Sequence, residues 1–110
     1  MLTGKTVLIT GGGTGVGADL ARGFAGAGAS VIIAGRRAAP LEAVAREISG
    51  QAIAADVTDE AQVTALFAKT GPVDVVIANA GASTSAPLTR TSLADWQTML
   101  DVNLTGVFLT

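Results

Sequence analysis

The sequence has 110 residues, of which 49% are hydrophobic and 15% charged, a composition that fits one small globular α/β domain. The formal net charge of -2 offers no basic surface for nucleic acid, and no apolar run approaches the roughly 20 residues that cross a membrane. Because cysteine and histidine are both absent, disulfides, Cys/His metal sites, cysteine nucleophiles and Ser-His pairs are excluded. The opening residues MLTGK lack a signal-peptide pattern, so we expect a cytoplasmic protein.

Four short runs that are mostly apolar throughout are predicted to be strands buried on both faces. They cover residues 6–10, 30–34, 51–55 and 73–78. Helical patterns are found at residues 16–27, 40–49 and 59–70, and again from residue 93 onward. Pro40 suits the first turn of its helix. Asp59 with Gln62, and Ser92 with Asp95, have the spacing of a capping box, in which each side chain bonds the other's backbone N–H.

Strand and helix alternate four times, and no linker, repeat or low-complexity block separates them. Right-handed crossovers between parallel strands would place the helices on both faces of the sheet. We therefore expect residues 1–110 to belong to one domain of the α/β class, with a doubly wound, Rossmann-like parallel sheet in the strand order 3-2-1-4. A ligand would bind at the carboxyl ends of strands 1 and 4, where that order reverses direction.

A run rich in glycine, residues 11–17, separates the first predicted strand from the first predicted helix. Glycines there permit a tight turn and a close approach of ligand to backbone, and a helix amino terminus offers free N–H groups to a pyrophosphate. A tight connection without a ligand is the alternative. The fingerprint G-x-G-x-x-G does not fit, because Val16 stands where its third glycine is required. The spacing that fits, T-G-x-x-x-G-x-G, is formed by Thr10, Gly11, Gly15 and Gly17.

This glycine spacing resembles that of the short-chain dehydrogenase/reductase family, and three further motifs follow in the family's order. Asp56 and Val57 follow the third strand, NAG at residues 79–81 follows the fourth, and VNLTGVF at residues 102–108 lies on the last helix. The resemblance implies an NAD(P)-dependent oxidoreductase that interconverts an alcohol and a ketone or aldehyde by hydride transfer. It also implies a small-molecule substrate and a homo-oligomer when the protein is full length.

The resemblance also implies roles for individual residues in binding the cofactor. The pyrophosphate would be held by Gly11, Thr14, Gly15, Val16 and Gly17. Asp56 and Val57 would contact the adenine. The nicotinamide-side ribose would lie against Asn79, Ala80 and Gly81. Simple structural roles are the alternative: Asp56 could cap the segment that follows it, and Gly81 could make a turn.

The end of the second predicted strand bears on the choice between NAD and NADP. A carboxylate there would accept hydrogen bonds from the ribose 2′-hydroxyl of NAD, whereas a 2′-phosphate repels a carboxylate and prefers arginine. The sequence instead has Gly35 followed by Arg36 and Arg37, and a guanidinium can bind a phosphate with two hydrogen bonds. NADP(H) is therefore favoured, with NAD possible. A solvated arginine pair at the start of a loop is the alternative.

Members of the family use an Asn-Ser-Tyr-Lys arrangement in which the tyrosine transfers the proton. Asn103 matches the asparagine, and its helical spacing with Trp96, Leu100 and Val107 predicts that it is at least partly buried. The chain contains no tyrosine, and it ends at Thr110 within the last predicted helix.

We therefore expect an amino-terminal part, less than half, of an oxidoreductase, and we expect these 110 residues to be inactive alone. The alternative is a stand-alone nucleotide-binding or interaction module without catalysis. A coding sequence that continued past Thr110 into a serine and a Tyr-x-x-x-Lys segment would favour the enzyme.

Overall fold

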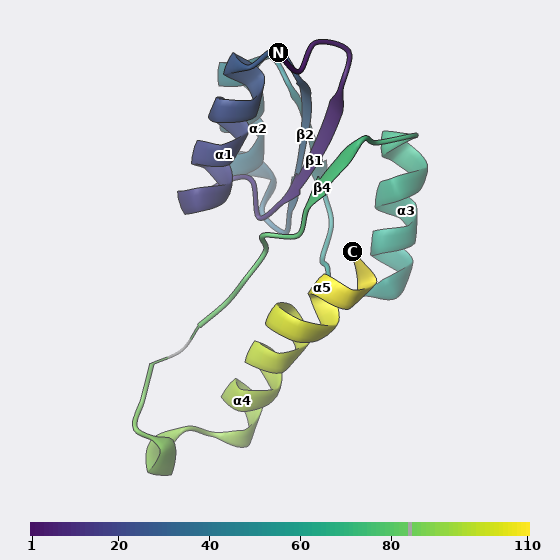
Figure 1. The fold of residues 1–110 in the computed structure, drawn as a ribbon. Helices are drawn as coiled ribbons and strands as arrows, with labels where there is room; N and C mark the ends of the chain where they lie inside the picture. The colour runs from purple at the N-terminus through teal and green to yellow at the C-terminus, as the bar shows by residue number, and fades with distance from the viewer. Residues whose placement is uncertain (84) are drawn as a thin grey trace.

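The computed structural model describes residues 1–83 and 85–110 (Figure 1). Its strands are β1 (Thr6–Thr10), β2 (Ser30–Gly35), β3 (Gln51–Ala54) and β4 (Val75–Ile77). The helices that follow the first three strands are α1 (Gly15–Gly26), α2 (Ala38–Ile48) and α3 (Glu60–Thr70). After the short turn η1 (Leu88–Arg90), the chain forms one continuous helix made of α4 (Leu93–Leu100), the π-helical turn η2 (Asp101–Thr105) and α5 (Gly106–Leu109).

The four strands form one parallel sheet in the order β3-β2-β1-β4, which confirms the predicted order 3-2-1-4. Strand β1 is central, because Val7 is paired with Val31 of β2 on one side and with Val75 of β4 on the other. The chain crosses from one side of β1 to the other between β3 and β4. The carboxyl ends of β1 and β4 therefore lie side by side at the point where the strand order reverses.

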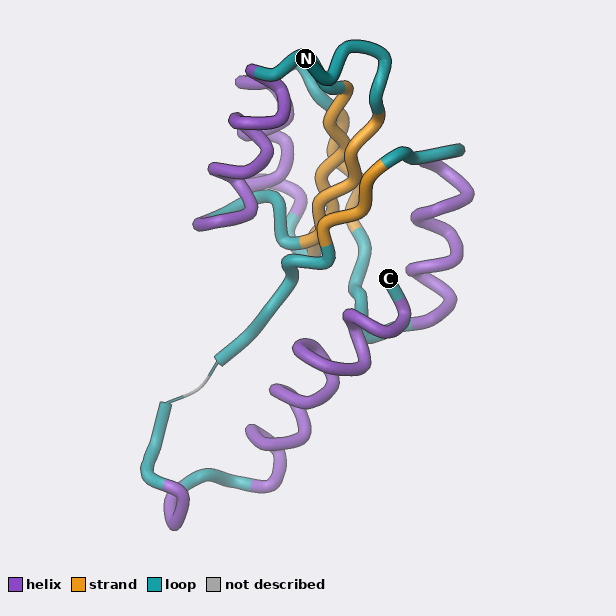
Figure 2. Tube along the Cα trace, viewed as in Figure 1, coloured by secondary structure: helices purple, strands orange, loops and turns teal. Residues whose placement is uncertain are grey.

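Strands β1 and β2 are buried on both faces, and successive side chains enter two separate cores. On one face, Ile9 and Ile33 pack with α1 and α2; on the other, Leu8 and Ile32 pack with Leu66 of α3. Figure 2 shows α1 and α2 together on one side of the strands and α3 on the opposite side. Each fully buried aliphatic side chain contributes about 1.5–3 kcal/mol of transfer free energy. The alternation of strand and helix thus yields the doubly wound arrangement expected.

The prediction that all four strands are buried on both faces is wrong for β3 and β4. Val76, at the centre of β4, has 39% of its surface exposed, and Gln51 and Ala54 of β3 are also exposed. Within the described part of the chain, each of these two strands pairs on one side only. Strand β4 is also shorter than predicted, because its regular pairing with β1 is confined to Val75–Ile77.

Both predicted N-cap side chains bond their helices, but within the described residues neither predicted capping box is completed by a bond to the N–H of the N-cap residue. The Asp59 carboxylate accepts hydrogen bonds from the N–H groups of Ala61 and Gln62, at 3.0 and 3.3 Å, and Ser92 Oγ accepts one from Asp95 N–H at 3.0 Å. The side chain of Gln62 does not complete a capping box on Asp59 N–H. Its Oε1 instead accepts from Asp56 N–H at 2.9 Å, and its Nε2 donates to Asp59 Oδ2. The turn before α3 is thereby tied to its first residues.

The last helix does not cover a face of the sheet. Figure 1 shows that it extends beyond the carboxyl ends of the strands, with α4 farthest from the sheet and α5 nearest to it, and the molecule has an elongated shape of 49 × 25 × 24 Å. Large apolar side chains along it are exposed, namely Leu93, Trp96, Leu104, Val107 and Phe108. None of the helices described in the structure combines the length and apolar character needed to cross a membrane.

Candidate cofactor site

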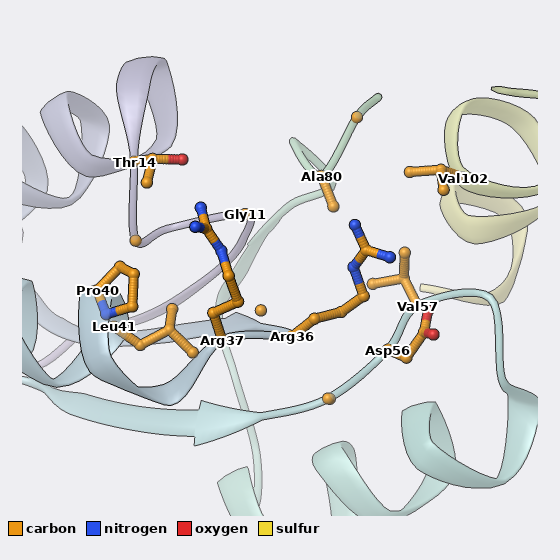
Figure 3. A pocket seen from close by; sticks show the side chains of 14 residues that line it. Gly11, Thr14, Arg36, Arg37, Pro40, Leu41, Asp56, Val57, Ala80 and Val102 are labelled. Carbon is orange, nitrogen blue, oxygen red and sulfur yellow. The ribbon is translucent and has the colours of Figure 1, made fainter. Parts of the chain in front are cut away.

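A pocket lies at the carboxyl ends of the strands, beside the reversal point (Figure 3). Its lining comprises Gly11, Gly13, Thr14, Gly35, Arg36, Arg37, Pro40, Leu41, Ala55, Asp56, Val57, Ala80, Gly81 and Val102. Most residues assigned to cofactor binding from the sequence are therefore brought together. Gly15, Val16, Gly17 and Asn79 are not part of this lining.

Five lining residues were not assigned to cofactor binding from the sequence: Gly13, Pro40, Leu41, Ala55 and Val102. Four of them are immediate neighbours of motif residues, or lie one turn away from them, so proximity along the chain was an available signal. Leu41 is different, because its side chain enters the core while its backbone borders Gly13. A core residue at a pocket wall carries no distinctive sequence pattern.

The glycine turn brings three parts of the chain into close contact. Gly11 has φ = +66°, and a Cβ placed on it would lie 2.9 Å from Ala80 Cα. A Cβ on Gly17 would overlap the carbonyl oxygen of Gly11 and lie 2.6 Å from Asn79 Nδ2. Only glycine fits at either position. Gly17 therefore allows helix α1 to approach the turn closely, which explains why it does not line the pocket.

Thr10 and Asn79 join the ends of β1 and β4. The buried Thr10 Oγ1 accepts hydrogen bonds from the N–H groups of Asn79 and Ala80, at 3.0 and 3.1 Å. In return, Asn79 Nδ2 donates to the carbonyl oxygens of Thr10 and Gly11, at 3.2 and 3.3 Å. These contacts make Asn79 a positioning residue, because its side chain is committed to the glycine turn. Ala80 and Gly81 are left at the pocket wall.

The two arginines that follow β2 extend into the pocket. In Figure 3, the Arg37 guanidinium lies toward Gly11 and Thr14, whereas the Arg36 guanidinium lies between Ala80 and Val57. Both side chains are exposed. Within residues 1–83 and 85–110, neither arginine forms an ion pair with an acidic side chain. Two positive charges thus remain available at the end of β2, where Gly35 provides no carboxylate.

Asp56 combines the two roles that the sequence left open. Its Oδ1 accepts hydrogen bonds from Thr58 Oγ1 at 2.7 Å and from Thr58 N–H at 2.9 Å, so it does cap the turn that follows β3. These two bonds and, to a smaller extent, the charge of Arg36 hold the pKa of the Asp56 carboxyl below its ordinary value, although partial burial opposes the shift. Asp56 also lines the pocket, so a fixed negative charge faces the site.

The expectation that Asn103 is at least partly buried is wrong, because its side chain is exposed. The stripe that motivated this prediction does not pack on the sheet: Trp96 is 51% exposed, and Val107 is exposed as well. The amide of Asn103 instead bonds both backbone groups of Ala82. Asn103 Oδ1 accepts from Ala82 N–H at 2.9 Å, and Nδ2 donates to the Ala82 carbonyl at 2.7 Å. Both polar groups of the Asn103 amide are therefore hydrogen-bonded although the residue is exposed.

Comparison with known proteins agrees with this geometry. The model of the short chain dehydrogenase family matches residues 5–110. The chain belongs to this family. Two curated members illustrate the relationship: the NADP-dependent (R)-specific alcohol dehydrogenase of Lentilactobacillus kefiri is 40% identical, and the serine 3-dehydrogenase of Agrobacterium fabrum is 47% identical. The alignments cover 97% and 93% of this chain, but only 46% and 44% of the two relatives.

A solved structure of a similar protein matches the fold closely. The 3-ketoacyl-(acyl-carrier-protein) reductase from Brucella melitensis, complexed with NADH, superposes with a TM-score of 0.92 at 38% identity. The match covers 99% of this chain and 48% of the reductase. The Rossmann-like sheet predicted from the sequence is therefore confirmed, and the chain spans about half the length of the proteins that it matches.

Proposed function

We propose that this chain is the dinucleotide-binding part of an NADP(H)-dependent oxidoreductase that interconverts an alcohol and a ketone or aldehyde. Family membership supports hydride-transfer chemistry. The observation that carries the choice of cofactor is the pair Arg36 and Arg37, which line the pocket directly after β2 where Gly35 supplies no carboxylate. A small-molecule substrate, and assembly into a homo-oligomer in the full-length protein, are parts of the same proposal.

The residues at the pocket fit a dinucleotide in chemical terms. The amino terminus of α1 faces the glycine turn, and the side chain of its N-cap, Thr14, makes no capping hydrogen bond. The first N–H groups of α1 are thus not engaged by that side chain, and the positive end of the helix favours an anionic pyrophosphate. No acidic residue in the first turn of α1 opposes this charge.

The adenosine end would lie between the arginines and the Asp56–Val57 segment. A guanidinium can hold the 2′-phosphate bidentately, while the ionised Asp56 carboxylate can accept a hydrogen bond from the adenine amino group. The NADP-dependence of the related alcohol dehydrogenase supports this assignment. The related reductase was crystallised with NADH, so members of the family differ in cofactor, and the assignment here rests on the arginines.

A bound nicotinamide would supply or accept the hydride. The residues of this chain would position it: Asn79 fixes the segment carrying Ala80 and Gly81, and Asn103 holds the next residue, Ala82. These 110 residues include no tyrosine to transfer the proton. We therefore propose that they bind the cofactor but do not turn over substrate alone.

Replacement of Arg36 by aspartate tests the cofactor assignment. The exchange removes a phosphate donor and adds a repelling carboxylate, and one charge-assisted hydrogen bond contributes about 1.5–3 kcal/mol, or roughly 10- to 150-fold in affinity. Fluorescence titration with NADPH and NADH should show that Arg36→Asp weakens NADPH binding by at least about tenfold more than NADH binding.

Arg90→Asp is the matched control, because Arg90 is an exposed arginine in η1 and does not line the pocket. It makes the same change in net charge and should leave the ratio of the two affinities unchanged. Equal losses of NADPH and NADH affinity in Arg36→Asp would contradict the assignment of Arg36 to the 2′-phosphate. A wild-type chain that binds neither cofactor would overturn the proposed function.

A further inference from the structure

The first residue of α5, directly after the π-helical turn η2, lies against Val57, a residue of the pocket lining. Gly106 follows η2 and is buried, and a Cβ placed on it would lie 2.7 Å from Val57 Cγ2 and 3.4 Å from Val57 Cβ. Real Cβ atoms do not approach other carbons to 2.7 Å, and valine has little freedom to move aside because its χ1 is restricted. The helix can therefore sit at its present distance from Val57 only because residue 106 is glycine.

The same turn of helix also holds the segment after β4, in which Ala80 and Gly81 line the pocket. Asn103, three residues before Gly106, bonds both backbone groups of Ala82 in the segment after β4. Val102, beside Asn103, is buried and lines the pocket together with Val57 (Figure 3). One turn of helix thus contacts Val57 after β3 and Ala82 after β4. Single π turns inside α-helices are frequent at functional sites.

We propose that Gly106 is a positioning residue that sets the separation between the Val57 wall and the Ala82 segment. By letting the start of α5 lie close to Val57, it places the Asn103 amide, in the preceding turn η2, at hydrogen-bonding distance from Ala82. Under the proposed function, on which this inference rests for its ligand, Val57 borders the adenine side of the cofactor and Ala82 follows the nicotinamide side. A methyl group at position 106 therefore disturbs both ends of the dinucleotide.

The first test needs no cofactor. In Gly106→Ala, the added methyl pushes η2 away from Val57 and lengthens the two bonds between Asn103 and Ala82. The exchange rate of the Ala82 amide hydrogen, measured by NMR on the unliganded 110-residue chain, should rise at least about threefold, because that amide is held by Asn103 Oδ1. Alanine is otherwise the better helix former, so an effect of helix propensity alone would act in the opposite direction.

Two further variants separate this contact from a general structural effect. In the double variant Val57→Ala/Gly106→Ala, the γ-methyl carbons of residue 57 are gone, and the exchange rate of Ala82 should return toward the wild-type value. Gly23→Ala is the matched control: Gly23 lies inside α1, and a Cβ there meets nothing within 4 Å. This variant should leave the exchange rate of Ala82 unchanged.

The second test measures binding of NADP⁺ and of adenosine 2′,5′-bisphosphate, which carries the adenine end only. Gly106→Ala should weaken both, and should weaken NADP⁺ more, because NADP⁺ also reaches the Ala82 side. Unchanged Ala82 exchange in Gly106→Ala, or exchange that the double variant fails to restore, would overturn the inference. Wild-type protein that does not bind NADP⁺ would overturn the proposed function instead, and the exchange experiment would still decide the role of Gly106.

Discussion

Two regions of this molecule carry apolar residues at regular spacing, but only one of them buries these residues. In the sheet, Leu8 and Ile33 are inaccessible to solvent, because helices pack on both faces. In the helix formed by α4, η2 and α5, Phe108 is 84% exposed and no residue of α4 is buried. Periodicity therefore predicts which secondary structure forms, whereas burial depends on whether another element of the chain lies opposite that face.

The two regions also hold the pocket in different ways. At the ends of β1 and β4, Thr10 and Asn79 are joined by hydrogen bonds that are at least partly buried, next to a fully packed core. At η2, the exposed Asn103 amide and one close contact at Gly106 hold the other side. We expect the junction of β1 and β4 to unfold only with the whole domain. The side held by Asn103 and Gly106 should open locally, at a lower free energy than global unfolding.

The largest expected difference between the regions concerns stability. Ile33→Ala removes a fully buried side chain from the centre of β2 and should lower the free energy of unfolding by about 2–5 kcal/mol. Leu104→Ala removes an aliphatic side chain of η2 that is 66% exposed, and should change the free energy of unfolding by less than about 0.5 kcal/mol. Urea titrations followed by circular dichroism measure both. Similar losses in the two variants would show that the last helix is part of the cooperative core.

The sequence predictions were correct for the strand order of the packed sheet and less accurate for the exposed last helix. The strand order and the three helices on the sheet could be predicted, because residues such as Leu8 and Ile33 lie in runs whose packing partners are in the same chain. The pocket could be placed because T-G-x-x-x-G-x-G and the residues after β3 and β4 must meet at the carboxyl edge of a parallel sheet. The exposure of Asn103, the π turn and the contact of Gly106 with Val57 could not be predicted, because they depend on distances between elements that no local pattern encodes.

A second prediction concerns the junction between β1 and β4. Thr10→Val keeps the shape of the side chain but removes the oxygen that accepts hydrogen bonds from Asn79 N–H and Ala80 N–H. Asn79 N–H still donates to the Ile77 carbonyl at 3.0 Å, but the partly buried Ala80 N–H loses its partner, which should lower the free energy of unfolding by about 1–3 kcal/mol. Thr64→Val, at an exposed position of α3, is the control and should have little effect. Equal stability of Thr10→Val and the wild type would mean that these bonds do not fix the glycine turn.

A third, smaller effect should separate the two N-caps. Asp59 caps α3, whose Leu66 is buried in the core, so Asp59→Ala should lower the free energy of global unfolding by about 1 kcal/mol. Ser92 caps α4, which buries none of its residues, so Ser92→Ala should reduce helix content locally without changing the midpoint of global unfolding. Circular dichroism at 222 nm without denaturant, together with urea midpoints, distinguishes the two outcomes. A lower urea midpoint for Ser92→Ala would place α4 in the same cooperative unit as α3.

The smallest expected effect is a dependence of stability on pH that originates at Asp56, in the part of the pocket lining that follows β3. Its pKa in the folded state lies below the unfolded value of about 3.9, chiefly because Thr58 Oγ1 and Thr58 N–H bond its ionised form. Between the two pKa values the unfolded state therefore binds more protons than the folded state. The contribution of the ionised Asp56 to the free energy of unfolding is complete above the unfolded pKa, and it is lost as the pH falls through the folded pKa. The free energy of unfolding of the wild type should exceed that of Asp56→Asn by a margin that shrinks as the pH falls from 6 to below about 4. This decrease should be smaller than the loss of stability caused by Asp59→Ala. Thr58→Val removes the hydroxyl donor and should weaken this pH dependence. If the margin of the wild type over Asp56→Asn stayed constant or grew on acidification, the hydrogen bonds from Thr58 would not be its cause.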